Sequence, residues 1–364
     1  MPGKFAISFL IAFFCFAAGA FAQPFAYIAN NDGSSISVID VSTNTVVDTI
    51  ATGERPSGTA VSPDGAFVYV ALQTPNEVIA IDVSLNEIVA TVPAGDSPTG
   101  IDITPDGRFL YVANTGSDNV SVISVASYSV VDTIPFLDSP VGVVVSPDGG
   151  SVYVTCYETN SISVISTASN TVTATIGPTN GPFGLDIGPD GAFLYVANEA
   201  ADNVLVISTA ANTIVDAIPV GITPVALVVS PAGGRVYVAN AISNTVSVIR
   251  TADNSVIDEI PVGSGPIGID VTSDGRFVYV SNAESNSVSV IRTADNTVVD
   301  IVPVGALPSS FGKFITPGGS GPVSSIPTLG EWGLIALSAL FGLSAMFAIR
   351  KRRNAAAQAG TSFH

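Results

Sequence analysis

Short apolar runs alternate with polar turns along most of the chain, at a spacing typical of β-strands rather than helices. Residues 98–137 illustrate the pattern, because four runs of β-branched, aromatic or small residues are separated by turn signals. The runs are residues 100–104, 109–113, 120–123 and 130–134. Pro105-Asp106-Gly107 is a turn in which glycine supplies a positive φ. The pattern predicts four strands in this stretch and no helix.

The same pattern recurs at a fixed spacing of 42 residues, which two residue types report independently. Seven tyrosines share the step: Tyr27, Tyr69, Tyr111, Tyr153, Tyr195, Tyr237 and Tyr279. Seven prolines keep the same register: Pro56, Pro98, Pro140, Pro182, Pro224, Pro266 and Pro308. A period of roughly 40–45 residues, rich in short strands, is typical of the blades of a β-propeller.

The two ends of the repeat array predict how the ring closes. The first repeat begins at its second strand, residues 25–29, and has no first strand before it. The last repeat is followed by one further first-strand candidate, Gly312 to Pro317. We therefore expect an all-β, seven-bladed propeller over residues 23–317, with the last inner strand joining the three N-terminal strands. Closure removes sheet edges that would otherwise pair with other chains.

The segments outside the repeats predict export and a membrane anchor. Residues 1–22 have a basic start, an apolar core and a small-residue cleavage site, which is typical of a signal peptide; an uncleaved anchor is the alternative. Residues 318–325 form a Gly/Ser-rich linker. Residues 334–349 form an apolar transmembrane helix, stopped by Arg350, Lys351, Arg352 and Arg353. Because basic flanks stay cytoplasmic, residues 354–364 form a cytoplasmic tail and the propeller lies outside.

Charge narrows the range of partners. The predicted propeller holds 29 of the 30 acidic residues but seven of the 12 Lys and Arg, a net charge of about −22. Such a charge argues against nucleic acid or anionic lipid as partners and is compatible with cations or basic partners.

Candidate chemistry is sparse. The only histidine is His364, so the propeller cannot hold a Ser-His-Asp set or a histidine-based zinc site. Cys156, at the end of a predicted strand, is interpreted as a small core residue, with a reactive thiol as the alternative.

One pattern points to the channel. The third position of the first strand of each repeat, the strand expected to line the channel, is an aspartate in every second blade: Asp102, Asp186 and Asp270. Three carboxylates in the channel could bind a hard cation such as Ca²⁺. The alternative is that each aspartate bonds backbone or water.

The repeat resembles the YVTN-type, YncE-like β-propeller family over residues 25–317. The features that carry the resemblance are Tyr-Val-Ala-Asn at Tyr111, Tyr195 and Tyr237, Ser-Pro-Asp-Gly turns at 62–65 and 146–149, and Ile-Pro-Val-Gly at 260–263. The resemblance implies the fold, and it admits cell-surface proteins as well as lactonases and quinoprotein-like subunits. Lactonases of this kind would place histidine and arginine in the channel, and this chain has no histidine there.

The tail resembles the IPTL-CTERM sorting signal over residues 326–353. The matching residues are Ile326, Pro327, Thr328, Leu329, Trp332 and Gly333, followed by the apolar run and the basic stop. The resemblance implies processing by an exosortase-type enzyme of a Gram-negative bacterium and delivery to the cell surface or matrix.

These observations favour a sorted, non-enzymatic propeller that binds an unknown protein or glycan or serves structurally. The alternative is a periplasmic lactonase-like or dehydrogenase-accessory propeller tethered to the inner membrane. The connections between second and third strands vary most, and Tyr157 is their most plausible exposed aromatic residue. No cofactor other than Ca²⁺ is implied.

Overall fold

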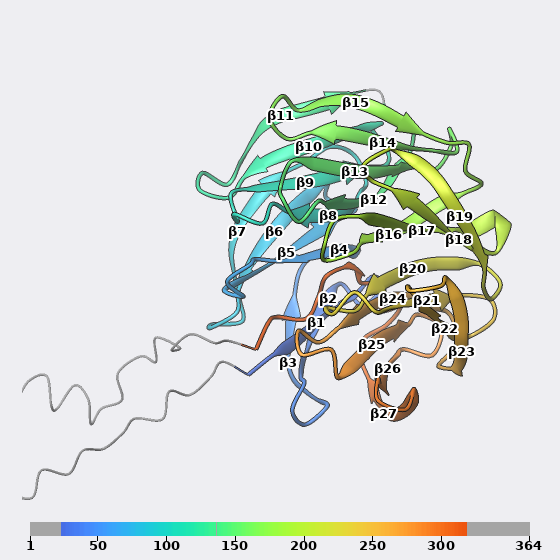
Figure 1. The fold of residues 1–364 in the computed structure, drawn as a ribbon. Helices are drawn as coiled ribbons and strands as arrows, with labels where there is room; N and C mark the ends of the chain where they lie inside the picture. The colour runs from blue at the N-terminus through green and yellow to red at the C-terminus, as the bar shows by residue number, and fades with distance from the viewer. Residues whose placement is uncertain (1–22, 136, 319–364) are drawn as a thin grey trace, which may run out of the picture. The chain divides into compact units, whose positions relative to one another are not determined.

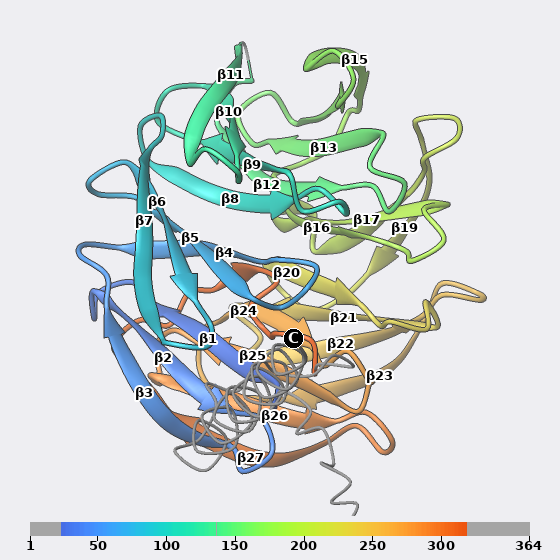
Figure 2. The same cartoon turned by 90° about the vertical axis from the view of Figure 1, so that its left-hand side faces the viewer.

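A computed structural model describes residues 23–135 and 137–318 as a ring of seven antiparallel sheets (Figure 1). Successive blades are joined through their innermost strands, and Figure 2 shows β4, β8, β12, β16, β20 and β24 gathered in the interior of the ring. The all-β, seven-bladed prediction is confirmed.

The strands follow in chain order, with one short 3₁₀ helix, η1, between β17 and β18. They are β1 (Phe25–Asn30), β2 (Ser35–Asp40), β3 (Thr45–Ala51), β4 (Pro56–Val61), β5 (Phe67–Leu72), β6 (Glu77–Asp82), β7 (Glu87–Pro93), β8 (Pro98–Ile103), β9 (Phe109–Asn114), β10 (Asn119–Ser124), β11 (Ser129–Pro135), β12 (Pro140–Val145), β13 (Ser151–Cys156), β14 (Ser161–Ser166), β15 (Thr171–Ile176), β16 (Pro182–Ile187), β17 (Phe193–Asn198), η1 (Glu199–Ala201), β18 (Asn203–Ser208), β19 (Thr213–Pro219), β20 (Pro224–Val229), β21 (Arg235–Asn240), β22 (Thr245–Arg250), β23 (Ser255–Pro261), β24 (Pro266–Val271), β25 (Phe277–Asn282), β26 (Ser287–Arg292), β27 (Thr297–Pro303) and β28 (Phe311–Gly312).

The core lies between neighbouring blades rather than inside any one of them. The second and third strands of each blade are almost wholly buried, whereas the fourth strand is mostly exposed. Tyr111 packs against Val143 and Val152 of the next blade, and equivalent clusters repeat around the ring. Cys156 is buried in the same cluster as Tyr111, which confirms its interpretation as a core residue.

The repeating tyrosines also link blades through their hydroxyl groups. Tyr111 donates to Asn170 Oδ1 over 2.8 Å, and that asparagine stands in the turn between the third and fourth strands of the next blade. Tyr27 donates to Asn86 over 2.7 Å in the same way. The repeating tyrosines thus supply apolar volume, and Tyr27, Tyr111 and Tyr279 also link neighbouring blades through their hydroxyl groups.

The ring closes through the N-terminal and C-terminal segments. Thr316 N donates to Phe25 O and Tyr27 N donates to Phe314 O, each over 2.9 Å. The predicted closure is confirmed, but the closing segment is irregular: its short strand β28 pairs in parallel with β4 of the neighbouring blade.

Several predictions concern residues outside those that the structure describes. They are the signal peptide (1–22), the linker after Gly318, the sorting motif, the helix at 334–349 with its basic stop, and the tail at 354–364. Within residues 23–135 and 137–318, no helix is long and apolar enough to cross a bilayer.

Candidate functional site

The closing inner strand carries two residues more than the other inner strands. Pro308 pairs with Asn30 and Ile315 pairs with Ala26, so seven steps of the closing strand face four steps of β1. In the preceding blade five steps of β24 face four steps of β25. The closing strand therefore bulges, and a bulge redirects the side chains that it contains.

The sequence contains a sign of this insertion. Thr316 Oγ1 accepts a hydrogen bond from Phe25 N over 2.8 Å, as Ser62 Oγ accepts one from Phe67 N over 2.9 Å. Thr316 therefore occupies the position equivalent to Ser62, the first residue of the turn that follows an inner strand. It follows Thr272, its equivalent in the previous blade, by 44 residues instead of 42.

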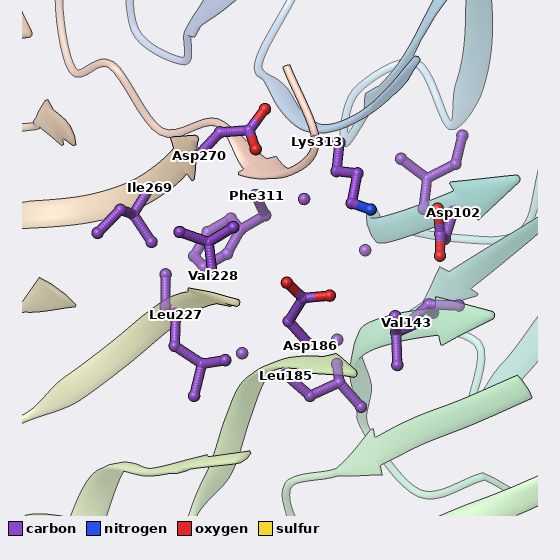
Figure 3. Close-up of a pocket in the computed structure, with 17 residues that line it drawn as sticks. Asp102, Val143, Leu185, Asp186, Leu227, Val228, Ile269, Asp270, Phe311 and Lys313 are labelled. Carbon is purple, nitrogen blue, oxygen red and sulfur yellow. The ribbon is translucent and has the colours of Figure 1, made fainter. Parts of the chain in front are cut away.

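The bulge places Phe311, Gly312 and Lys313 in the central channel (Figure 3). Gly312 has a φ of +88°, and a Cβ atom there would lie 2.5 Å from Thr59 O, so glycine is required for both reasons. Lys313 extends its side chain into the channel, where it is exposed to the channel space. The sequence places Lys313 in the closing strand but does not predict that its side chain reaches the channel.

The three alternating aspartates lie around Lys313, and each bonds the backbone of two inner strands. Asp102 Oδ1 accepts from Ile103 N and its Oδ2 accepts from Val145 N of the next blade, both over 2.8 Å. Asp186 repeats this pattern with Ile187 N and Val229 N, over 2.9 Å and 2.8 Å.

Asp270 accepts hydrogen bonds from its own strand, β24, and from the bulged closing strand. Its Oδ1 accepts from Val271 N, and its Oδ2 accepts from both Phe314 N and Ile315 N, each over 2.8 Å. The backbone-bonding alternative is therefore what these carboxylates do in the structure. Each one joins its own blade to the next, and Asp270 holds the closing strand.

The channel groups perturb one another's pKa values. Burial raises the pKa of Asp102 and of Asp270 to about 6, although Lys313 and the backbone donors pull in the opposite direction. Burial also raises the pKa of Asp186, whereas Asp186 above all raises the pKa of Lys313. Among the described residues, Lys313 forms no ion pair within 4 Å, so its charge compensates the carboxylates across the channel.

The structure brings the three predicted metal-binding aspartates to one channel, but with a lysine among them. In residues 23–135 and 137–318 there is no group of three or more His, Cys, Asp or Glu arranged to hold a metal ion. Calcium binding at Asp102, Asp186 and Asp270 stays a prediction, and a bound cation would have to share the channel with Lys313.

Lys313 and the aspartates separate two spaces in the channel. On the side of the connections between blades lies a small cavity of about 50 Å³, lined by Phe311 and by glycines of the inner strands. On the other side lies a vestibule of about 480 Å³, lined by valines, isoleucines and prolines together with the channel aspartates and Lys313. The rim of the vestibule is a series of prolines: Pro63, Pro105, Pro147, Pro189, Pro231 and Pro317.

An aromatic row leads from the small cavity to the surface. Phe311 lies 5.4 Å from Phe183, measured between ring centroids, and Phe183 meets Tyr157 edge-on at 6.1 Å. Tyr157, which we expected to be exposed, is half-buried. The neighbouring Glu199 carboxylate raises the pKa of its hydroxyl.

Comparison with protein families agrees with the repeat and its channel. The profile of the YncE-like β-propeller family matches residues 46–235, more than half of the chain. The chain belongs to the YncE-like β-propeller family. A profile described as lactonase, 7-bladed β-propeller matches residues 223–298, and the IPTL-CTERM motif matches residues 324–353. None of the curated proteins matches this YncE-like protein.

Solved propellers resemble this YncE-like chain in fold. A structure titled hydrazine synthase, from Kuenenia stuttgartiensis, is 25% identical with a TM-score of 0.67, covering 78% of this chain and 99% of that one. A functionally unknown protein from Desulfotomaculum acetoxidans is 21% identical with a TM-score of 0.71, covering 79% and 98%. The dihydro-heme d1 dehydrogenase NirN is 18% identical with a TM-score of 0.60, covering 77% and 63%.

Proposed function

We propose that this YncE-like propeller is exported, sorted through its IPTL-CTERM tail to the cell surface or matrix, and acts there as a binding or structural scaffold without catalysis. An exosortase-type enzyme would process the tail. The partner would be a protein or a glycan held by the outer connections, since loops on a rigid scaffold carry most recognition.

The observation that carries this proposal is how the channel aspartates are used. Each accepts backbone N–H groups from two inner strands, so its position is tied to the integrity of the ring. Phe311 and Lys313 then occupy the space that a substrate would enter in an open channel. The sorting motif supplies the second support, because it links the propeller to export machinery.

The intact mass of the protein from its own host tests the proposal. We expect an extracellular form that begins near Gln23 and ends between Ile326 and Gly333. A form that retains every residue to His364 and stays in the inner membrane would contradict sorting and leave a tethered periplasmic domain.

The second candidate is a lactonase-like hydrolase or a subunit associated with a dehydrogenase. It is favoured by the lactonase profile over residues 223–298 and by the enzymes named among the similar structures. A carboxylate with a pKa of about 6 beside an open vestibule also suits a general base near neutral pH.

Lactone turnover decides between the two candidates. If the protein is a lactonase, it should hydrolyse lactones at a measurable rate. Asp102→Asn should lower that rate about 100-fold with the fold preserved. Absence of hydrolysis across short-chain and aromatic lactones would leave the scaffold role as the better account.

A further inference from the structure

The two faces of the propeller differ in charge. One face is made of the connections between second and third strands and between blades; we call it the loop face. Its connections hold nine acidic residues: Asp32, Glu54, Asp96, Asp118, Asp138, Glu158, Glu199, Asp202 and Glu284. They hold one basic residue, Arg55, whose Nε donates to Asn31 Oδ1 over 3.3 Å.

The opposite face, which we call the turn face, neutralises much of its charge internally. All four ion pairs of the described residues lie there, including Arg250 with Asp253 at 2.7 Å and Arg292 with Asp295 at 2.6 Å. Arg235 also lies on this side, where its Nη1 donates to Thr293 O over 2.6 Å. The connections of the turn face hold seven acidic residues against Arg108 and Arg276, a net charge of −5, compared with −8 on the loop face, where no carboxylate forms an ion pair among the described residues.

The loop face also carries the aromatic row. Tyr157 stands between β13 and β14, and Phe183 follows the first residue of β16, so both lie where strands meet this face. Both side chains are half-buried, and Glu199 lies beside the Tyr157 hydroxyl. An aromatic ring next to a carboxylate is suited to an arginine or lysine side chain, because both attract a cation.

The loop face points away from the chain's exit. Pro317 lines the vestibule on the turn face, and a Cβ atom on Gly318 would lie 3.6 Å from Pro24 Cδ. The first and last described residues are thus neighbours on the turn-face side (Figure 1). The loop face therefore lies opposite the two ends of the propeller that the structure describes.

We propose that the loop face, centred on Tyr157, Phe183 and Glu199, binds a cationic polypeptide segment rich in arginine or lysine. The inference names a partner class for the scaffold proposed above. It rests on that proposal only for the location of the protein at the cell surface or matrix. A field of one sign raises the local concentration of an oppositely charged partner, and the aromatic row supplies the contact that fixes its place.

Binding of labelled short peptides to the full chain, measured by fluorescence anisotropy at about 0.15 M salt, tests the proposal. A peptide of alternating arginine and glycine is expected to bind, whereas one of alternating glutamate and glycine is not. Tyr157→Leu should weaken binding about threefold, and Tyr157→Phe, which keeps the ring, should leave it unchanged.

A matched pair of charge variants separates a defined site from general attraction. Glu199→Gln and Glu87→Gln each remove one negative charge, but Glu87 is exposed on the turn face. We expect Glu199→Gln to weaken binding about threefold and Glu87→Gln to change it by less than about 1.5-fold. Equal effects of the two, or binding of a neutral oligosaccharide in preference to the basic peptide, would overturn the proposal. Host fractionation is a separate readout, so a correctly sorted protein that ignores the basic peptide refutes this inference alone.

Discussion

Replacing Tyr128 by asparagine should stabilise the propeller, because one blade lacks an acceptor that other blades have. Tyr27, Tyr111 and Tyr279 each donate a hydrogen bond of 2.6–2.8 Å to an asparagine in the next blade. In each case the asparagine lies in the turn between the third and fourth strands. At the equivalent position Tyr69 meets Tyr128, and among the described residues the buried Tyr69 hydroxyl has no hydrogen-bond partner. Tyr128 also has a φ of +47°, a conformation that asparagine tolerates better.

The magnitude follows from three contributions. A hydrogen bond to the Tyr69 hydroxyl contributes about 1 kcal/mol, and moving a tyrosine out of the left-handed region contributes about 1 kcal/mol. Tyr128 packs partly against the cluster around Tyr69, and losing that contact costs about 1 kcal/mol. The net gain in the free energy of unfolding is about 1 kcal/mol, or about 2 °C in Tm for a domain of this size.

Urea unfolding followed by circular dichroism measures this gain without depending on tyrosine fluorescence. A double-mutant cycle isolates the new bond. Tyr69→Phe should be neutral in the wild type but should cost about 1 kcal/mol in the Tyr128→Asn background. Tyr111→Phe, which removes an existing bond to Asn170, is the control and should cost about 1 kcal/mol in the wild type. If Tyr69→Phe costs as much as Tyr111→Phe in the wild type, the Tyr69 hydroxyl is already satisfied and the reasoning fails.

Three further predictions concern the channel. Gly312→Ala should destabilise the protein by about 2 kcal/mol more than Gly53→Ala. Both glycines have φ near +90°, but only at Gly312 would the added Cβ clash with a backbone oxygen. Equal losses of stability in urea unfolding would refute the clash. The free energy of unfolding should rise as the pH falls from about 7 towards 3.8. Asp102 and Asp270 have pKa values of about 6 in the folded state, above the unfolded value of 3.8. The folded state therefore binds more protons than the unfolded state in that pH window. Asp102→Asn should reduce this slope, and an unchanged pH profile would show that other groups set it. Lys313→Met should lower stability by about 1 kcal/mol, less than for a sealed ion pair because Lys313 is exposed to the channel space. Millimolar Ca²⁺ should restore part of the loss, and no response to Ca²⁺ would count against cation binding by the three aspartates.

The fold could be predicted from the sequence because strands that pack together from distant parts of the chain carry the same residues at a fixed spacing of 42. Tyr27 and Tyr279 are far apart in the chain, yet each marks a second strand, and the count of strands at the two ends indicated where the ring closes. The alternation of Asp102 and Asp186 indicated channel residues for the same reason. The asparagine that accepts from Tyr27 or Tyr111 lies 59 residues later in the chain, and the one that accepts from Tyr279 is Asn44, so this pairing required the blades to be placed side by side.

The site was less predictable because it depends on a departure from the period. Lys313 lies in the closing strand, and with regular spacing its equivalent in β24 would be Val271, beside Asp270 rather than in its place. Two additional residues leave the alternation of the strand unchanged on either side, so the difference is confined to the bulge, which redirects the side chains that it contains. The spacing of 44 residues between Thr272 and Thr316 was available in the sequence, but its consequence required knowing that Thr316 caps Phe25.

The closing strand completes the ring before the sorting motif begins. Asp270 holds Phe314 and Ile315, Thr316 holds Phe25, and Gly318 is the last residue that the structure describes, next to Pro24. The sorting motif begins only at residue 324, after a glycine- and serine-rich stretch. Removal of the chain from the motif onward would therefore leave every bond of the closure in place. A cut before Pro308, by contrast, would remove the inner strand of one blade, the channel lysine and the two backbone N–H groups that donate to Asp270, and would expose β1 as an unpaired edge. The motif thus begins after the closure is complete, and processing of the tail as proposed above would leave the closed ring intact.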